Sequence, residues 1–353
     1  MTKILLNNLW VYKNLKTLFI VNIISFFVCL VCLFFGIKLL KAKKAGQPIL
    51  KYVEEHKNKS GTPTMGGLFF VLPSIIIFFV FGGGSYRVSL VCSIIALAFL
   101  IVGFLDDFIK IKSSQNQGLK AYQKIIFQLV ISFFAGLFAY TRGLTVFYLP
   151  FSRNFVDLGI FSFPLISLVF IAITNSVNLT DGLDGLAGGT CSIYLFFMMV
   201  LIGFQISMPT KFYQSDEEYY MLMMLACSVL GGIFAFLVFN TAKASVFMGD
   251  TGSLALGGLL GGISVFSLNT LIIPVLGIMF VFTSISVIMQ VLYYKKTKKR
   301  IFLMAPFHHH LEKKGLKESK ISYIYMAITG TLGCLLILVY LWGEKCKLVV
   351  KRF

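Results

Sequence analysis

Long runs of apolar residues recur through nearly the whole chain, and they restrict its fold more than any other feature. An α-helix that crosses the hydrocarbon core of a bilayer needs about 20 such residues, and about ten runs approach or exceed this length. They are Leu18–Leu40, Met65–Phe81, Val88–Leu105, Ile125–Tyr140, Phe161–Thr174, Leu186–Ile206, Tyr219–Phe239, Ser253–Phe266, Leu271–Tyr293 and Tyr323–Trp342.

The low charge of the chain agrees with a membrane location. Of 353 residues, 58% are hydrophobic and only 13% are charged, whereas about a quarter of the residues of an average soluble domain are charged. We therefore predict an all-α, polytopic membrane protein of about ten transmembrane helices, forming a single integral membrane domain over residues 1–353. The fifth run is expected to continue into a polar motif that begins at Asn178.

The positive charge of the chain is assigned to the membrane surface. The formal net charge is +18, which in a soluble protein would suggest a nucleic-acid partner; here the partner is the lipid bilayer and no nucleic acid is expected. With ten spans, most of the 32 Lys and Arg residues fall on the side that holds residues 38–59. Because cytoplasmic loops are rich in Lys and Arg, we assign this side to the cytoplasm and both termini to the outside.

A polar motif with two carboxylates, Asn178–Gly185 (NLTDGLDG), lies between two of the apolar runs. A charge inside a bilayer costs about 3 kcal/mol or more, so such residues are candidates for function. Asp181 and Asp184 are three residues apart, a spacing that on a helical turn places them on one face. The neighbouring glycines allow a ligand to come close. The motif therefore indicates a polar ligand; the alternative is an ordinary helix start with an Asp cap.

Two further acidic sites lie at the ends of predicted spans on the same side. Asp106 and Asp107 end the third run, near Lys110 and Lys124, and Asp250 begins the eighth. Because adjacent residues of a helix diverge by about 100°, the Asp106–Asp107 pair is not expected to chelate one ion together; a structural salt bridge is the alternative role. Hard cations such as Mg2+ bind a few carboxylates and keep positions for phosphate oxygens. We therefore predict a magnesium and phosphate site.

Two loops on this side are candidate substrate contacts. Between Lys59 and Gly67, Pro63 and the glycines predict a fixed turn that presents backbone and hydroxyl groups to a phosphate or sugar, with Lys59 as counter-charge; the alternative is a plain loop-to-helix transition. Three consecutive histidines, His308 to His310, cannot all face one metal from a regular helix or strand, so a zinc site is not expected. We interpret this loop as substrate-binding, reaching back over the carboxylates; the alternative is a surface loop without function.

Together these segments resemble the bacterial phospho-N-acetylmuramoyl-pentapeptide transferases, which belong to the polyprenyl-phosphate N-acetylhexosamine-1-phosphate transferase superfamily. The aspartate motifs are common to the superfamily, whereas GTPTMGG and the triple histidine are specific to the muramoyl-pentapeptide branch. The matching stretches keep the family order and span almost the whole chain. They are Gly61–Gly67 (GTPTMGG), Asp106-Asp107, Asn178–Gly185 (NLTDGLDG), Val246–Ser253 (VFMGDTGS) and Met304–His310 (MAPFHHH).

The resemblance implies a ten-span enzyme of the bacterial cytoplasmic (inner) membrane with its active site facing the cytoplasm. It implies transfer of phospho-N-acetylmuramoyl-pentapeptide from UDP-N-acetylmuramoyl-pentapeptide to undecaprenyl phosphate, which gives lipid I and UMP in peptidoglycan biosynthesis. The implied cofactor is Mg2+, and the resemblance is compatible with a homodimer.

The resemblance also assigns roles to single residues. Asp250 would bind the metal, and Asp106 would act as base toward the lipid phosphate, with Asp107 beside it as a third catalytic residue. The other matched residues are expected to bind the substrates: Lys59, Thr64, Lys110, Lys124, Asn178, Asp181, Asp184, Asn240, His308, His309 and His310. Two positions depart from the family pattern, because members often have Glu near Thr283 and Lys at the position of Gln117.

Two questions stay open at this level. A phosphate monoester has a second pKa of about 6 and is already a nucleophile near neutral pH, which favours direct attack by the lipid phosphate; the alternative is a two-step path through an aspartyl intermediate. The rival functions are a sister transferase that moves N-acetylglucosamine-1-phosphate to the same lipid, and a transporter, because intramembrane charges also mark transport paths.

Overall fold

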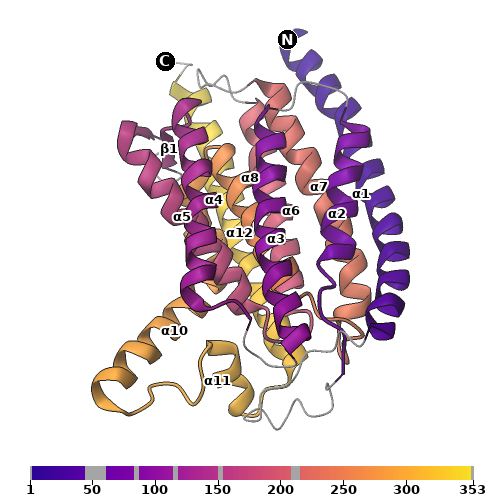
Figure 1. The fold of residues 1–353 in the computed structure, drawn as a ribbon. Helices are drawn as coiled ribbons and strands as arrows, with labels where there is room; N and C mark the ends of the chain where they lie inside the picture. Colours follow the sequence, from indigo (N-terminus) through magenta and orange to yellow (C-terminus); the bar gives the residue numbers. More distant parts are fainter. Residues whose placement is uncertain are drawn as a thin grey trace.

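The computed structural model describes residues 2–43, 61–82, 87–113, 118–149, 154–207 and 215–350. Over these residues the chain forms twelve α-helices, most of them side by side in an elongated bundle, and two short strands (Figure 1). Eight helices in this part of the chain are long and apolar enough to span a membrane. The prediction of an all-α polytopic membrane protein is therefore confirmed.

Every predicted run except the ninth corresponds to one helix. The fifth helix continues to Thr180, as expected, and the third continues beyond the predicted end at Leu105, so that it includes Asp106, Asp107 and Lys110. The helices are α1 (Thr2–Ala42), α2 (Leu68–Phe81), α3 (Arg87–Ser113), α4 (Ala121–Thr141), α5 (Ser162–Thr180), α6 (Leu186–Ser207), α7 (Asp216–Asn240), α8 (Gly249–Phe266) and α12 (Glu318–Val350).

The ninth run is not one helix, which corrects the sequence prediction. It begins with a 3-10 turn, η3 (Thr270–Ile272), and the short α9 (Ile273–Leu276), and a separate helix, α10 (Ile278–Thr297), starts after Gly277. Pro274, which lacks an N–H donor, and Gly277 lie where the helix breaks. Beyond the break α10 leaves the bundle and lies at its lower edge in Figure 1, next to α11 (Phe307–Lys313).

The central helix of the bundle is α8, in which every residue from Thr251 to Phe266 is buried. Its glycines allow the neighbouring helices to come close: a Cβ at Gly257 would lie 2.5 Å from Cα of Thr174 in α5, and one at Gly262 would lie 2.5 Å from Sγ of Cys92 in α3. Small residues permit such close packing between membrane helices. This packing brings the start of α8 against the ends of α3 and α5, where the acidic motifs lie.

The two ends of the bundle differ. The start of α1 and the end of α12 lie at one end, together with a hairpin that the sequence did not predict (Figure 1). Its strands, β1 (Val146–Leu149) and β2 (Asn154–Asp157), pair antiparallel, with Val146 opposite Asp157. The acidic motifs and α11 lie at the opposite end. The arrangement agrees with both termini being on the side away from the acidic motifs.

Candidate active site

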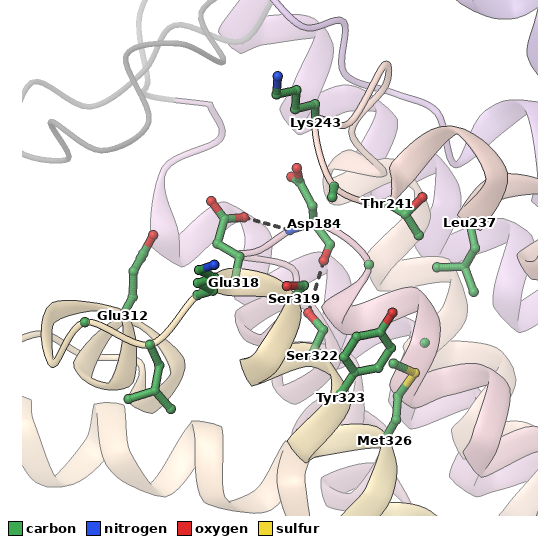
Figure 2. A pocket seen from close by; sticks show the side chains of 16 residues that line it. Asp184, Leu237, Thr241, Lys243, Glu312, Glu318, Ser319, Ser322, Tyr323 and Met326 are labelled. Atoms are coloured by element: carbon green, nitrogen blue, oxygen red, sulfur yellow. Dashed lines mark hydrogen bonds between the residues drawn. The ribbon is translucent and has the colours of Figure 1, made fainter.

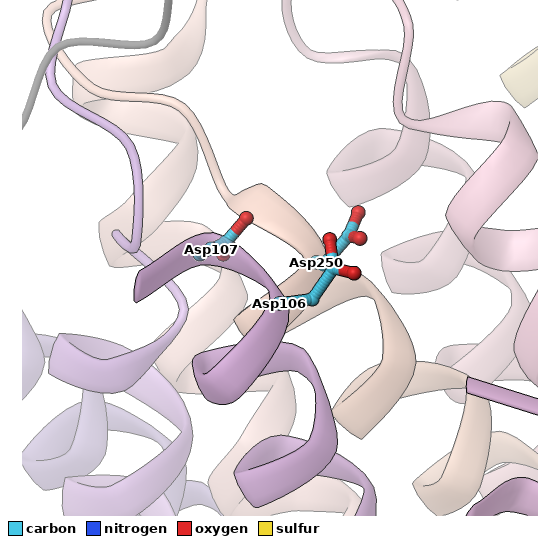
Figure 3. A group of neighbouring side chains, drawn as sticks. All are labelled: Asp106, Asp107 and Asp250. Carbon is cyan, nitrogen blue, oxygen red and sulfur yellow. The ribbon is translucent and has the colours of Figure 1, made fainter. Parts of the chain in front are cut away.

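Three aspartates from two helices converge at one end of the bundle (Figure 3), and we call them the carboxylate cluster. Asp106 and Asp107 lie near the end of α3, and Asp250 lies in the first turn of α8. One carboxylate oxygen of each lies within 4.8 Å of those of the other two. Gly103 makes this approach possible, because a Cβ at this position would collide with the backbone carbonyl of Asp250.

Asp106 and Asp107 do not diverge as the spacing of about 100° between adjacent helical residues predicts. Oδ2 of Asp107 accepts hydrogen bonds from the backbone N–H of Thr251 (2.9 Å) and from its hydroxyl (2.7 Å). Oδ1 of Asp106 accepts a hydrogen bond from the backbone N–H of Leu119 (2.9 Å). The angle of about 100° between adjacent residues describes only the directions in which their Cα–Cβ bonds leave the helix. The hydrogen-bond donors and the side-chain torsions determine the final positions of the two carboxylate groups. Both residues can therefore contribute to one cation site.

Two lysines lie directly on the carboxylate cluster. Nζ of Lys110 is 2.5 Å from Oδ2 of Asp106 and 3.0 Å from Oδ2 of Asp250. Nζ of Lys124, in α4, is 2.8 Å from the same oxygen of Asp250. Three carboxylates and two ammonium groups leave an excess of one negative charge. Carboxylate oxygens are the ligands that hard divalent cations prefer, so the cluster fits such a cation.

Asn178 connects α5 to the carboxylate cluster. Its Nδ2 donates to Oδ1 of Asp250 (2.7 Å) and to Oγ of Ser253 (2.8 Å), and its Oδ1 accepts from Nζ of Lys124 (3.4 Å). About one turn further from the cluster, the side-chain amides of Gln128 and Asn175 exchange two hydrogen bonds, of 3.3 and 2.7 Å. Two polar pairs thus join α4 to α5, and they determine where Lys124 lies.

Asp181 and Asp184 do not share a helical face, which corrects the sequence prediction. Because α5 ends at Thr180 and α6 begins at Leu186, residues 181–185 form a turn. Oδ2 of Asp184 accepts a hydrogen bond from the backbone N–H of Ala244 (3.1 Å). Asp184 therefore links this turn to the loop that leads into α8.

Asp181 is coupled electrostatically to the carboxylate cluster. Burial, and then the negative charges of Asp250, Asp107 and Asp184, raise the pKa of its carboxyl group to about 8. At neutral pH this side chain is therefore mostly protonated and able to donate a hydrogen bond.

Asn240, at the end of α7, is buried and joins two of the motifs. Its Oδ1 accepts a hydrogen bond from the backbone N–H of Gly185 (3.0 Å), and its Nδ2 donates one to the carbonyl of Val246 (2.8 Å). The amide is thus engaged with the backbone on both sides. Its contribution to the site is to hold the acidic turn against the loop before α8.

Thr64 lies beside the carboxylate cluster and is buried. Its hydroxyl has no hydrogen-bond partner among the described residues. A Cβ at Gly249, whose φ is +72°, would lie 2.6 Å from this hydroxyl and would collide with Oδ2 of Asp107. Gly249 therefore leaves both oxygens facing the same small space. Lys59, the predicted counter-charge, lies outside the described residues.

The three histidines lie in α11 and have different neighbours. A Cβ at Gly182 would collide with Nε2 of His308, so this histidine packs on the Asn178–Gly185 turn. Nδ1 of His309 is 2.9 Å from Oε2 of Glu312, and Nδ1 of His310 accepts a hydrogen bond from the backbone N–H of Leu303 (3.1 Å). The three rings therefore face different neighbours.

Several residues that support the cluster were not predicted from the sequence. Thr251 stands within VFMGDTGS, next to Asp250, and was passed over because its partner is far away in the sequence. Gln128 is a polar residue inside the fourth apolar run, four positions after Lys124, and Asn175 directly follows the fifth run, three positions before Asn178. Because such spacings place residues on one helical face, they were the available signal for a polar link between the two helices.

The structure describes one of the two positions that depart from the family pattern. Thr283 is buried in α10, and its hydroxyl donates to the carbonyl of Met279 (2.8 Å). Gln117 lies outside the described residues.

Comparison with known proteins adds an independent result. A family model described as glycosyl transferase family 4 matches residues 89–268, and one described as phospho-N-acetylmuramoyl-pentapeptide-transferase signature 1 matches residues 59–71. The phospho-N-acetylmuramoyl-pentapeptide-transferase of Clostridioides difficile (strain 630) is 39% identical over 88% of this chain and 94% of its own length. The enzyme of that name from Desulfitobacterium hafniense (strain DSM 10664 / DCB-2) is 38% identical over 87% of this chain and 92% of its own length. The one from Clostridium novyi (strain NT) is 41% identical over 85% of this chain and 89% of its own length.

Proposed function

The chain belongs to the phospho-N-acetylmuramoyl-pentapeptide transferases, and we propose that it transfers phospho-N-acetylmuramoyl-pentapeptide from UDP-N-acetylmuramoyl-pentapeptide to undecaprenyl phosphate. The products are lipid I and UMP. The structural observation that supports this most directly is the convergence of Asp106, Asp107 and Asp250 beside Lys110 and Lys124. A site that combines carboxylates for a cation with lysines for phosphate oxygens suits a reaction between two phosphorylated substrates.

The reaction joins an oxygen of the acceptor phosphate to the β-phosphorus of the donor. The bond from that phosphorus to the oxygen that bridges to the α-phosphorus breaks, and this oxygen leaves with UMP. Catalysis of phosphoryl transfer consists mostly of positioning and charge neutralisation. Lys110 and Lys124 are placed to bind phosphate oxygens of the substrates, and Asn178 keeps Asp250 in position between them.

We assign Mg2+ as the cofactor, held by Asp250 together with Asp106 and Asp107. When bound, it offsets the negative charge of the diphosphate and stabilises the leaving group. The assignment follows from the donor set, because three carboxylate oxygens suit magnesium better than softer metals.

Asp106 is proposed to orient or deprotonate the acceptor phosphate. The hydrogen bond from Leu119 holds one of its oxygens, and Lys110 lies against the other. Because the second pKa of a phosphate monoester is about 6, the acceptor is mostly ionised at neutral pH and needs no strong base. We therefore propose direct attack rather than an aspartyl intermediate.

The remaining matched residues are assigned to substrate binding around this centre. Thr64 faces the same space as Asp107, and His308 covers the turn that carries Asp181 and Asp184. We place the site on the cytoplasmic face of the inner membrane, because the loops at this end carry most of the Lys and Arg residues. The protein is proposed to act as one integral membrane domain, and a homodimer is compatible with this arrangement.

The proposal is tested by measuring UMP release from the purified full-length protein in detergent. The assay contains undecaprenyl phosphate, Mg2+ and UDP-N-acetylmuramoyl-pentapeptide, with Asp250→Ala as control. Release that requires the acceptor and Mg2+, and is lost in the control, is the expected result. Turnover with UDP-N-acetylglucosamine but not with the muramoyl-pentapeptide donor would instead assign the sister reaction, and silence with both donors from a folded protein would contradict transfer altogether.

A further inference from the structure

A hollow lies beside the Asn178–Gly185 turn, and Figure 2 shows the side chains that line it. Its volume is about 620 Å³, and it is lined by Asp184 and Gly185 of the turn, by the adjoining ends of α6 and α7, by the loop 241–243 and by residues of the segment 312–326. Asp106, Asp107 and Asp250 are not among its lining residues. We call this hollow the rim pocket.

The rim pocket lies where three membrane spans end. The spans are Leu186–Ile206, Asp216–Asn240 and Glu318–Leu341, and the lining residues fall within about two turns of these ends. The ends of transmembrane helices lie in the headgroup region of a bilayer. A ligand of this pocket therefore sits where phospholipid headgroups meet the first carbons of their acyl chains.

The wall of the rim pocket is apolar on the side nearer the centre of the spans. Leu237, Tyr323 and Met326 line it there, and Tyr323 is 67% exposed. Gly189 lets Met326 of α12 pack closely against α6, because a Cβ at Gly189 would lie 2.5 Å from Sδ of Met326. This wall suits hydrocarbon rather than a nucleotide or a sugar.

The rim of the pocket carries charges of both signs. Lys243 and Lys317 are positive, and Asp184, Glu312 and Glu318 are negative. In Figure 2 the carboxylate of Asp184 points toward Lys243, and Glu318 and Glu312 lie to one side of it. Three acids and two bases leave an excess of one negative charge, which disfavours an anionic ligand and suits one that carries both a phosphate and a cation.

We propose that the rim pocket binds a phospholipid whose headgroup ends in a primary ammonium group. The glycerol and first acyl carbons lie against Leu237, Tyr323 and Met326, and the phosphate faces Lys243 and Lys317. The ammonium group, with three N–H donors like a lysine side chain, faces the carboxylates of the rim. The three aspartates of the carboxylate cluster do not line this site, which shares Asp184 with the turn assigned to substrate binding.

A bound lipid contacts the same turn that carries Asp181 toward the carboxylate cluster. The backbone N–H of Asp184 donates to Oε2 of Glu318 (3.4 Å), and the hydroxyl of Ser322 donates to the carbonyl of Asp184 (3.1 Å). These bonds tie the turn to α12 at the floor of the pocket. Occupation of the pocket therefore stabilises the turn, and the thermal stability of the protein rises with the lipid.

The test is lipid retention by the purified full-length protein. The protein is incubated in detergent with phosphatidylethanolamine, phosphatidylcholine or phosphatidylglycerol, and bound lipid is counted by native mass spectrometry while Tm is followed. We expect phosphatidylethanolamine to be retained about fivefold better than the other two, as expected for about one additional charge contact at a membrane surface, and to raise Tm. Equal retention of the three lipids would overturn the proposal.

Two variants and two matched controls locate the site. Met326→Trp fills the pocket and Glu318→Gln removes a carboxylate that faces the ammonium group, so both should lose the preference for phosphatidylethanolamine. Leu338→Trp, at a 60% exposed position of α12, and Lys320→Gln, exposed on the same helix, should keep it. An unchanged preference in both pocket variants, or displacement of the lipid by UDP-N-acetylmuramoyl-pentapeptide, would contradict the assignment. Retention is measured without turnover, so its failure leaves the transfer proposal untouched.

Discussion

The carboxylate cluster and the rim pocket lie on either side of one turn and have the same inventory of charges, three acids and two lysines, in opposite arrangements. In the cluster, one oxygen of each acid lies within 4.8 Å of the others, and the lysines lie directly on them. In the rim pocket, Asp184 and Glu318 accept backbone N–H groups and surround an open space. The comparison teaches that convergence, rather than the number of acids, makes a cation site.

The largest predicted effect is that of replacing Asp250, a member of the carboxylate cluster. Asp250→Asn removes one charge from the cluster while keeping its shape, and we expect the rate of transfer to fall about a thousandfold, as when a preorganised charge contact is lost in other active sites. Glu318→Gln makes the same chemical change in the rim pocket and should lower the rate less than about threefold. Rates of UMP release, at matched Tm, check the pair; equal losses would contradict the difference between the two regions.

Lys124 provides the next test of the cluster. Lys124→Gln removes the ammonium group that lies 2.8 Å from Asp250, and the rate of transfer should fall about a hundredfold. Lys112→Gln is the matched control, because Lys112 is exposed near the end of α3. A comparable loss in the control would mean that general positive charge at this end of the bundle, rather than contact with Asp250, is what matters.

Variants of Gln128 and Asn175 test whether the position of α4 against α5 determines where Lys124 lies. Gln128→Leu breaks both hydrogen bonds to Asn175, and a shift of α4 should lower kcat about tenfold with little change in the KM for the donor. The exchange Gln128→Asn with Asn175→Gln restores a pair of similar reach and should recover most of the rate. Failure of this rescue, in a protein with unchanged Tm, would exclude a positioning role.

The smallest predicted effect concerns Asp181, which connects the two regions. Its folded-state pKa of about 8 lies above the ordinary value of 3.8, so the folded protein holds a proton that the unfolded chain releases. Stability therefore falls as pH rises between these values. Without added divalent cation, Tm should drop by a few degrees between pH 6 and pH 8, and the drop should be smaller in Asp181→Asn. An identical drop in both proteins would assign the pH dependence to another group.

Most of the fold was predictable because a long apolar run in lipid forms a helix, which pairs its own backbone N–H and C=O groups. The ninth run was the exception. Pro274 and Gly277 are both tolerated inside transmembrane helices when neighbours compensate, so neither residue by itself indicated that α10 would leave the bundle. The hairpin of β1 and β2 was missed because each strand has only four residues, far fewer than the runs that identify membrane spans.

The site was predicted as a set of motifs but not as a geometry. The motifs marked Asp106, Asp107 and Asp250, because carboxylates at the ends of spans are costly unless they have a function. Their convergence depends on Gly103 and Thr251, which act across helices distant in sequence. The separation of Asp181 from Asp184 followed from α5 ending at Thr180, which spacing alone did not indicate.

The most direct test of the central claim is the binding of Mn2+, which shares the oxygen ligands of Mg2+ and is visible by electron paramagnetic resonance. The full-length protein in detergent is titrated with Mn2+ alone, alongside Asp250→Asn and Glu318→Gln. We predict one tight Mn2+ per chain in the wild type and in Glu318→Gln, and its loss in Asp250→Asn. Tight binding that survives in Asp250→Asn, or that is lost in Glu318→Gln, would contradict a cation site in the carboxylate cluster.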